Sequence, residues 1–160
     1  MVKVCFVCLG NICRSPTAEG IMNVFVQEAN LQHKIKVDSA GTSAFHEGEP
    51  ADPRSQKAAN QRGYELTSRA RAFRKSDISQ FDYIVAMDTT NRNEILKMCS
   101  SDHQKEKLHL LRDFDPKSSP ETSVPDPYYG GANGFSEVLN ICERGCQGLL
   151  QTIRADKSYG

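Results

Sequence analysis

The sequence lacks an excess of charge of either sign. Its 160 residues contain 20 lysines and arginines against 20 aspartates and glutamates, so the formal net charge is zero. A protein that neutralises nucleic-acid phosphates or binds an anionic membrane surface usually carries a basic excess. The composition therefore argues against nucleic-acid and membrane partners, although it is compatible with a local basic pocket.

The sequence also lacks a long apolar run, an internal repeat and a low-complexity tract. No stretch approaches the roughly 18 apolar residues that a membrane span needs. The apolar segment at residues 2–8 soon meets Asn11 and Arg14, and no small-residue cleavage site follows it, so we interpret it as a buried strand and not as a signal peptide. We expect a cytoplasmic protein whose residues 1–160 form one domain.

The alternation of apolar segments predicts an α/β fold. Strands are indicated at residues 2–8, 35–39, 82–87 and 107–111, the second ending in a loop at residues 40–42. Helices are indicated from Ser15, as a plausible N-cap, to about Asn30, over 54–62, 89–98 and 135–153, with one turn at 75–80. Alternating strands and helices favour a parallel sheet. We expect three layers, with a four-stranded parallel sheet flanked by helices on both faces.

The segment between the first strand and the first helix is the strongest functional candidate. Cys8 and Arg14 are separated by five residues, and Ser15 follows. In parallel sheets, ligands bind at the carboxyl ends of strands. Consecutive backbone N–H groups in such a loop can converge on an anion, and the helix N-terminus adds positive partial charge. Gly10 is expected to supply the positive φ that tightens the turn.

This arrangement suits nucleophilic chemistry on a phosphate. Arg14 can present a bidentate fork to two phosphate oxygens. Helix N-termini and nearby cations favour the thiolate form of a cysteine. A Cys8 thiolate facing a bound phosphate could attack phosphorus and form a cysteinyl-phosphate intermediate. For a lone cysteine a buried structural role would be the better interpretation, but the Cys-x5-Arg-Ser spacing favours catalysis.

A leaving group needs a proton, and Asp126 is the candidate general acid. Pro125 and Pro127 restrict the backbone on either side and could hold the carboxyl group over the pocket. Alone, the segment is typical of an ordinary turn. Its combination with the cysteine loop raises the case for catalysis, and Tyr128 and Tyr129 could add aromatic walls.

The remaining cysteines suggest other roles. A reversible Cys8–Cys13 disulfide would protect the nucleophile from over-oxidation, while the alternative is that Cys13 merely packs under the loop. A zinc site at Cys5 and Cys8 is disfavoured because the two point to opposite faces of one strand. Cys142 and Cys146 fall on an apolar helix stripe, and the four histidines lack ligand spacing. We expect no metal and no cofactor, and we interpret the basic run at residues 69–75 as a solvated face.

Four segments together resemble the low-molecular-weight protein tyrosine phosphatases. They are residues 7–16 (VCLGNICRSP), 37–42 (VDSAGT), 81–88 (FDYIVAMD) and 126–130 (DPYYG). The resemblance implies that Cys8 is the nucleophile, Arg14 the phosphate clamp and Asp126 the proton donor. The other phosphate-binding residues would be Leu9, Gly10, Asn11, Ile12, Cys13 and Ser15. Loop support would come from Asn11, Ser15, Ser39 and Asp88, and pocket walls from Leu9, Phe45, Tyr128 and Tyr129.

The resemblance also implies phosphotyrosine-containing proteins or peptides as substrates, inorganic phosphate as product, and a monomer or weak self-association. The chain departs from the family pattern at Ser68, where some members carry a loop-supporting histidine. An arsenate reductase of the same fold would need relay cysteines, and only Cys99 lies mid-chain. A protein-arginine phosphatase tends to carry Thr in place of Ile12. A phosphate-binding scaffold would need neither thiolate nor acid, and no Walker loop is present.

Overall fold

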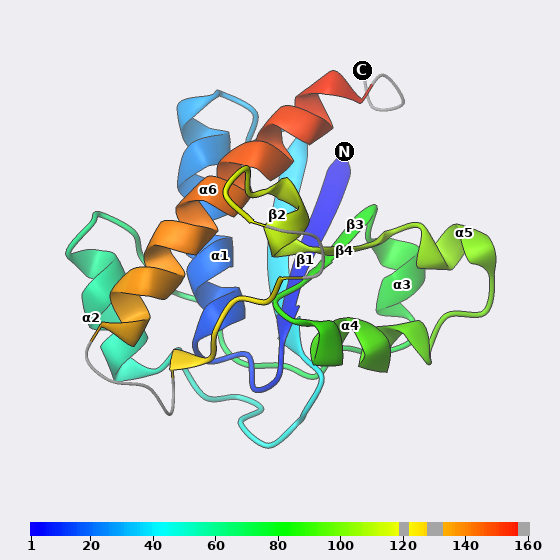
Figure 1. Cartoon of the computed structure of the whole chain (residues 1–160), viewed down its shortest axis with the longest axis horizontal. Helices are drawn as coiled ribbons and strands as arrows, with labels where there is room; N and C mark the ends of the chain where they lie inside the picture. Colours follow the sequence, from blue (N-terminus) through cyan, green and yellow to red (C-terminus); the bar gives the residue numbers. More distant parts are fainter. Residues whose placement is uncertain (119–121, 128–132, 157–160) are drawn as a thin grey trace.

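The computed structural model describes residues 1–118, 122–127 and 133–156 and has a parallel four-stranded sheet at its centre (Figure 1). The strands are β1 (Val2–Cys8), β2 (Ile35–Gly41), β3 (Tyr83–Ala86) and β4 (Leu108–Leu110). Their order across the sheet is β2-β1-β3-β4, and each neighbouring pair is parallel. The α/β class and the four-stranded parallel sheet predicted from the sequence are confirmed.

Helices cover both faces of the sheet, as expected. On one face, α1 (Arg14–Glu28) and α6 (Gly134–Ala155) pack on the side chains of Val4 and Phe6. On the other face, Val7 packs with residues of α3 (Asp77–Gln80) and α4 (Thr89–Leu96). The remaining elements are α2 (Pro53–Asn60), which contacts α6, a single turn α5 (Asp102–Lys105) and a 3-10 turn η1 (Leu111–Phe114).

β1 is central and almost entirely buried. Its alternate residues enter the two opposite apolar clusters, so each face of the strand is covered by helices. Burying one large apolar side chain contributes about 1.5–3 kcal/mol, and Phe6 is fully buried. This burial explains why the segment is apolar at nearly every position, and it fixes where the strand ends and the loop at Cys8 begins.

The structure corrects several predicted boundaries. The first helix begins at Arg14 with Cys13 as its N-cap residue, so Ser15 is not the cap. The second strand continues through Gly41, because Gly41 stays in register with Cys8 of β1, and the predicted loop at 40–42 begins later. The helix predicted to reach residue 62 ends at Asn60, and Gly63 follows it with a φ of 85°. The sequence did not predict α5 and η1, because elements of four residues are too short to show a helical period of apolar residues.

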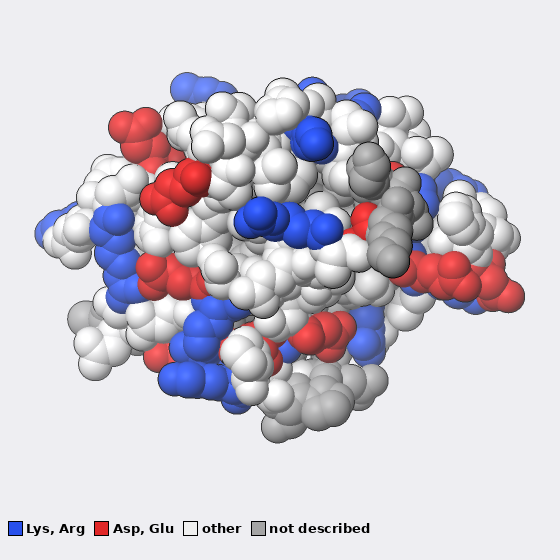
Figure 2. Space-filling view, turned by 90° about the horizontal axis from the view of Figure 1, so that it is seen from above, with Lys and Arg blue, Asp and Glu red and all other residues white. Residues whose placement is uncertain are grey.

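Charges of both signs are interspersed on the face seen in Figure 2, in keeping with the zero net charge. Across the described ranges 1–118, 122–127 and 133–156, no helix has the length and apolar character that a membrane span requires. Neither observation indicates a functional site, so we look for one in the loops at one end of the sheet.

Candidate active site

The strand order places two loops side by side at the carboxyl end of the sheet. β1 is followed along the chain by β2 on one side, whereas β3 is followed by β4 on the other. The chain therefore diverges between β1 and β3, which is where open α/β sheets bind ligands. Cys8 ends β1, and Asp88 follows β3 as the N-cap of α4. The topology thus brings two of the predicted site residues together.

The tight turn of the cysteine loop is made by Asn11 and not by Gly10. Asn11 has a φ of 59°, in the left-handed region, while Gly10 is absent from the positive-φ glycines. Asparagine tolerates this region better than most residues because its short amide can form local hydrogen bonds. Here the amide oxygen of Asn11 accepts from the backbone N–H of Arg71 at 3.0 Å. The expectation of a positive φ at Gly10 was therefore wrong.

The loop lies directly against the end of β2. The backbone N–H groups of Thr42 and Ser43 donate to the carbonyl oxygens of Cys8 and Leu9, both at 2.9 Å. A Cβ atom on Gly41 would lie 2.7 Å from the Leu9 carbonyl oxygen, closer than real Cβ atoms approach backbone. A glycine at residue 41 is therefore what allows the loop to pack on the strand.

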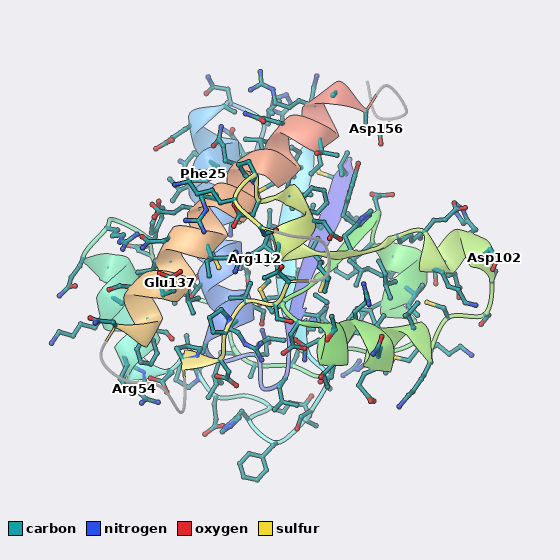
Figure 3. All side chains as sticks on the ribbon, in the orientation of Figure 1. Phe25, Arg54, Asp102, Arg112, Glu137 and Asp156 are labelled. Carbon is teal, nitrogen blue, oxygen red and sulfur yellow. The ribbon has the colours of Figure 1, made fainter. Side chains whose placement is uncertain are left out.

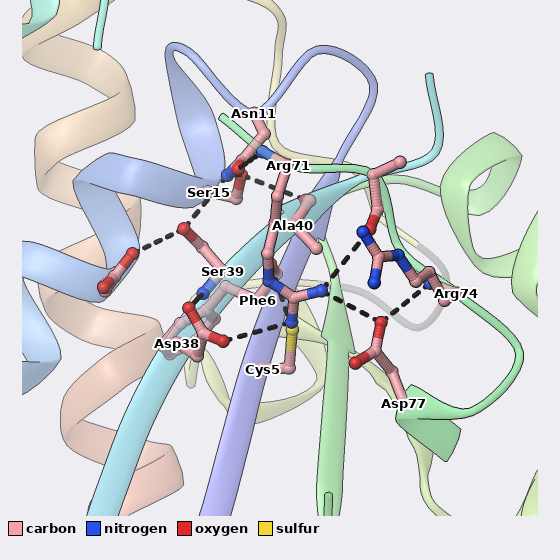
Figure 4. A network of polar contacts seen from close by, with 12 residues as sticks. Cys5, Phe6, Asn11, Ser15, Asp38, Ser39, Ala40, Arg71, Arg74 and Asp77 are labelled. Atoms are coloured by element: carbon pink, nitrogen blue, oxygen red, sulfur yellow. Dashed lines mark hydrogen bonds and ion pairs between the residues drawn. The ribbon is translucent and has the colours of Figure 1, made fainter. Parts of the chain in front are cut away.

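The Cys8 thiol lies in a dense polar environment although only 3% of the residue is exposed. Its Sγ is 3.0 Å from the Ser15 hydroxyl oxygen and accepts from the backbone N–H of Asn11 at 3.3 Å. The Asn11 amide nitrogen donates in turn to the Ser15 and Ser39 hydroxyls, at 2.8 and 3.0 Å. Figure 4 shows Asn11, Ser15 and Ser39 converging. The Cys8 sulfur is therefore surrounded by polar groups of the loop and of α1.

Arg14 is held by three groups from two other segments. Its Nη1 donates to Asp88 Oδ2 at 2.7 Å and to the Val124 carbonyl at 3.1 Å, and its Nη2 lies 3.7 Å from Asp126 Oδ2. Burial works to lower the pKa of Arg14, but the negative charges of Cys8, Asp88 and Asp126 together raise it. The guanidinium is therefore buried, charged and fixed in direction beside the loop.

Asp126 reaches the site because its segment, which follows β4 and η1 in the chain, packs against the end of β3. The Val124 N–H donates to the Met87 carbonyl at 2.7 Å, so residues 122–127 pass the end of that strand. Asp126 lines a hollow of about 420 Å³ whose other lining residues are Leu9, Arg14, Asp88, Thr89, Thr90, Asn91, Ser123, Val124 and Pro125. The cysteine loop and the candidate acid, 118 positions apart in sequence when counted from Cys8 to Asp126, thus meet at one hollow.

The residues predicted to form the pocket walls have three different outcomes. Leu9 is half exposed and lines the hollow. Phe45 is 86% exposed, packs edge-on against His46 and is not among the lining residues of that hollow, so its wall role stays a prediction. Tyr128 and Tyr129 lie outside the described residues.

The six cysteines are all free thiols. Cys13 is buried beneath the loop, and burial raises its pKa to about 12 despite a hydrogen bond with Ser55. Cys5 and Cys8 belong to opposite apolar clusters, as predicted from their spacing in a strand. In the described part of the chain, no group of three or more histidine, cysteine or acidic side chains could hold a metal ion.

Sequence reasoning missed Glu19, Arg71 and the Val124 carbonyl. Glu19 accepts from the Ser39 hydroxyl, and Arg71 binds both Asp38 and Asp77 at 3.0 Å while its backbone holds Asn11. Arg71 is therefore only partly exposed and does not belong to a solvated face. These contacts depend on tertiary proximity, and no local motif indicates them.

The site and the fold together match a known family. The family model described as "Low molecular weight phosphotyrosine protein phosphatase" matches residues 3–159. The chain belongs to this family. A low molecular weight protein-tyrosine-phosphatase of Streptomyces coelicolor is 43% identical over 153 residues, covering 95% of this chain and 93% of that protein.

Solved structures agree with this family assignment. A protein tyrosine phosphatase from Entamoeba histolytica, with Hepes in its active site, superposes with a TM-score of 0.91 at 44% identity, covering 96% of this chain and 97% of the other. The Drosophila arginine phosphatase superposes with a TM-score of 0.88 at 33% identity, covering 98% and 100%. The fold is thus shared by proteins named for two different phospho-residues.

Proposed function

We propose that this protein is a protein tyrosine phosphatase that hydrolyses phosphotyrosine and small aryl phosphates through a cysteinyl-phosphate intermediate. The observation that carries the proposal is the convergence of Cys8, Arg14 and Asp126 at one end of the sheet, with Asp126 Oδ2 3.7 Å from Arg14 Nη2. A nucleophile, an anion clamp and a proton donor together suit hydrolysis, whereas phosphate binding alone would require only the clamp.

In the first step, the Cys8 thiolate attacks phosphorus in line with the leaving oxygen. The S–P bond forms while the P–O bond to the aryl group breaks, and protonated Asp126 donates its proton to the departing phenoxide. The loop N–H groups and Arg14 stabilise the charge on the three equatorial oxygens. The Ser15 hydroxyl, 3.0 Å from Cys8 Sγ, supports the thiolate before attack.

In the second step, water replaces the thiolate. The Asp126 carboxylate takes a proton from a water molecule as that water attacks phosphorus, and the S–P bond breaks. Inorganic phosphate and the Cys8 thiolate are the products, and Asp126 is again protonated for the next cycle. The chemistry uses side chains of this protein alone, so we propose no metal and no organic cofactor.

Phosphotyrosine is favoured over phosphoarginine by Ile12, where arginine phosphatases tend to carry threonine. A cytoplasmic location, a single domain and a monomeric or weakly self-associating state also stay predictions. Redox control through a Cys8–Cys13 disulfide is proposed as well, because both thiols belong to the same short loop and both are free.

A phosphopeptide panel tests the proposal. Peptides of one sequence carrying phosphotyrosine, phosphoserine or phosphoarginine would be compared, with arsenate reduction measured alongside and with a chelator present. We expect release of phosphate from phosphotyrosine with a kcat/KM at least tenfold above the other substrates. Faster turnover of phosphoarginine, or arsenate reduction, would replace the proposed substrate.

Cys8→Ser and Cys99→Ser form a matched pair of variants for the same panel. Cys8→Ser should abolish turnover and retain phosphate binding, whereas Cys99→Ser, distant from the loop, should behave like the unmodified enzyme. Turnover by Cys8→Ser close to that of the unmodified enzyme would remove Cys8 as the nucleophile.

A further inference from the structure

Glu19 lies close to the hydrogen bonds that hold the nucleophile loop and is not among the residues that line the substrate hollow. It belongs to α1 and points toward β2, where the Ser39 hydroxyl donates to its Oε1 at 2.5 Å. Ser68 also hydrogen-bonds the carboxylate, and Asp38 and Arg71 are the charged groups that act on it. Burial raises the pKa of Glu19, although the hydrogen bonds from Ser39 and Ser68 oppose that shift.

The hydrogen bonds that link Glu19 to Cys8 have directions set by two groups: the Arg71 backbone N–H, which donates, and the Glu19 carboxylate, which accepts. The backbone N–H of Arg71 can only donate, so the group of Asn11 that faces it must be the amide oxygen. The Asn11 amide nitrogen therefore points at the hydroxyls of Ser15 and Ser39 and donates one hydrogen to each. Figure 4 shows this path from Arg71 through Asn11 to both serines.

Each serine hydroxyl has a single hydrogen to donate. Ser39 accepts from Asn11, so its own hydrogen is directed to the Glu19 carboxylate. Ser15 also accepts from Asn11, so its hydrogen is available either to Cys8 Sγ at 3.0 Å or to the Ala40 carbonyl at 3.5 Å. The latter distance is long for an O–H donor, so the contact with sulfur is favoured.

We propose that Glu19 is a positioning residue, the terminal acceptor that holds Ser39 and Asn11 so that the Ser15 hydroxyl donates to the Cys8 thiolate. The inference rests on the proposed role of Cys8 as nucleophile. Glu19 has no direct contact with the sulfur; it acts through three intervening side chains, those of Ser39, Asn11 and Ser15. With Ser68 in place of the histidine of some family members, a carboxylate and a hydroxyl together support the loop from behind.

Three variants test the proposal through kcat and the chemistry of Cys8. Glu19→Leu removes the acceptor, Glu19→Gln keeps an acceptor oxygen without the charge, and Glu28→Leu changes an exposed glutamate of the same helix. For each, kcat would be measured with p-nitrophenyl phosphate. The pH dependence of Cys8 alkylation by iodoacetamide would be followed by mass spectrometry of the Cys8 peptide.

We expect Glu19→Leu to lower kcat about five- to tenfold, the effect of one lost hydrogen bond, with little change in KM. Its Cys8 alkylation curve should move to higher pH because the thiolate loses support. Glu19→Gln should retain at least half of kcat, and Glu28→Leu should match the unmodified enzyme. Ser39→Ala should reproduce the loss, and combining it with Glu19→Leu should add nothing further.

An unchanged alkylation curve in Glu19→Leu would overturn the proposal, as would full additivity with Ser39→Ala. Equal losses in Glu19→Gln and Glu19→Leu would also overturn it, because a general need for charge, and not an acceptor, would then explain the result. Thermal unfolding of each variant separates these outcomes from simple loss of structure: Ser39→Ala carries the test if Glu19→Leu is unstable. Turnover by Cys8→Ser would instead contradict the nucleophile assignment, so the two failures are distinguishable.

Discussion

Arg14 and Asp88 form a 2.7 Å ion pair that joins the loop after β1 to the loop after β3. Only 4% of the Arg14 side chain is exposed, and its neighbours hold the guanidinium in one direction. Asp88 is itself fixed, since its other carboxylate oxygen caps α4 by accepting from the Asn91 N–H at 2.7 Å. The proposed clamp is therefore preorganised by a helix cap, which would reduce the entropy lost when a phosphate binds.

The first prediction concerns this pair. Arg14→Lys should lower kcat/KM on the order of 100-fold or more, because a lysine offers a point charge in place of a bidentate fork. Asp88→Asn should lower it about tenfold, since the guanidinium loses its nearer charged partner but keeps the Val124 carbonyl and Asp126. Steady-state kinetics with p-nitrophenyl phosphate and inhibition by inorganic phosphate measure both effects.

Glu94→Gln is the matched control for the ion pair, since Glu94 lies on the helix that Asp88 caps and pairs with exposed Lys97. It should leave the kinetics unchanged. Arg14→Lys with an undiminished affinity for phosphate would show that the clamp lies elsewhere.

The second prediction concerns Asp126 as general acid. Asp126→Asn should slow hydrolysis of phenyl phosphate about 100-fold or more, because its leaving phenoxide is strongly basic. It should slow p-nitrophenyl phosphate less than tenfold, since nitrophenoxide departs without a proton. Comparison of kcat for the two substrates measures the difference, and Asp102→Asn on the distant turn α5 is the control. Equal slowing of both substrates would mean that Asp126 transfers no proton to the leaving group.

The sequence predicts those parts of the site that depend on residues close together in the chain, and it misses those that depend on contacts between distant residues. The spacing of Cys8 and Arg14 and the apolar strand before them are local, so the loop and its position were predicted correctly. The positive φ was assigned to Gly10 because glycine is the usual choice, whereas Asn11 adopts it through a bond from Arg71, 60 positions away. The contacts of Glu19 and Val124 are likewise tertiary, and no periodicity or motif indicates them.

The third prediction concerns stability near the general-acid segment. Asp115 is buried and pairs with Arg144 at 2.9 Å and Arg112 at 3.3 Å, which ties η1 to α6. Figure 3 labels Arg112, which belongs to η1. Arg112 also donates to the Ser123 carbonyl at 3.4 Å, close to Asp126. Asp115→Ala should lower the free energy of unfolding by about 2 to 3 kcal/mol, because two cations lose their partner. Urea denaturation measures this, with exposed Glu106→Ala as the control.

The pH dependence of this contribution has a definite sign. Burial works to raise the pKa of Asp115, but Arg144 and the backbone N–H of Lys117 lower it below its ordinary value of 3.8. A carboxyl group with a lowered pKa in the folded state stabilises above its unfolded pKa and loses that contribution as pH falls. The difference in stability between the unmodified protein and Asp115→Ala should therefore be constant from pH 6 to 7 and shrink below about pH 4. A difference that grew on acidification would contradict the ion-pair account.

The fourth prediction concerns the rate of the proposed Cys8–Cys13 disulfide. Peroxide oxidises the Cys8 thiolate to a sulfenic acid; the Cys13 thiolate then attacks that sulfur, and hydroxide leaves as the S–S bond forms. Because burial raises the pKa of Cys13 to about 12, only about one molecule in 10⁵ has the attacking thiolate at pH 7. Disulfide formation should therefore be slow at neutral pH and accelerate about tenfold per pH unit between pH 7 and 9.

Peptide mapping after a peroxide pulse measures the linked fraction. Cys13→Ser should progress to irreversible inactivation, and Cys99→Ser should recover with thiol like the unmodified enzyme. A linked fraction that forms at the same rate across this pH range would mean that the loop opens before Cys13 reacts.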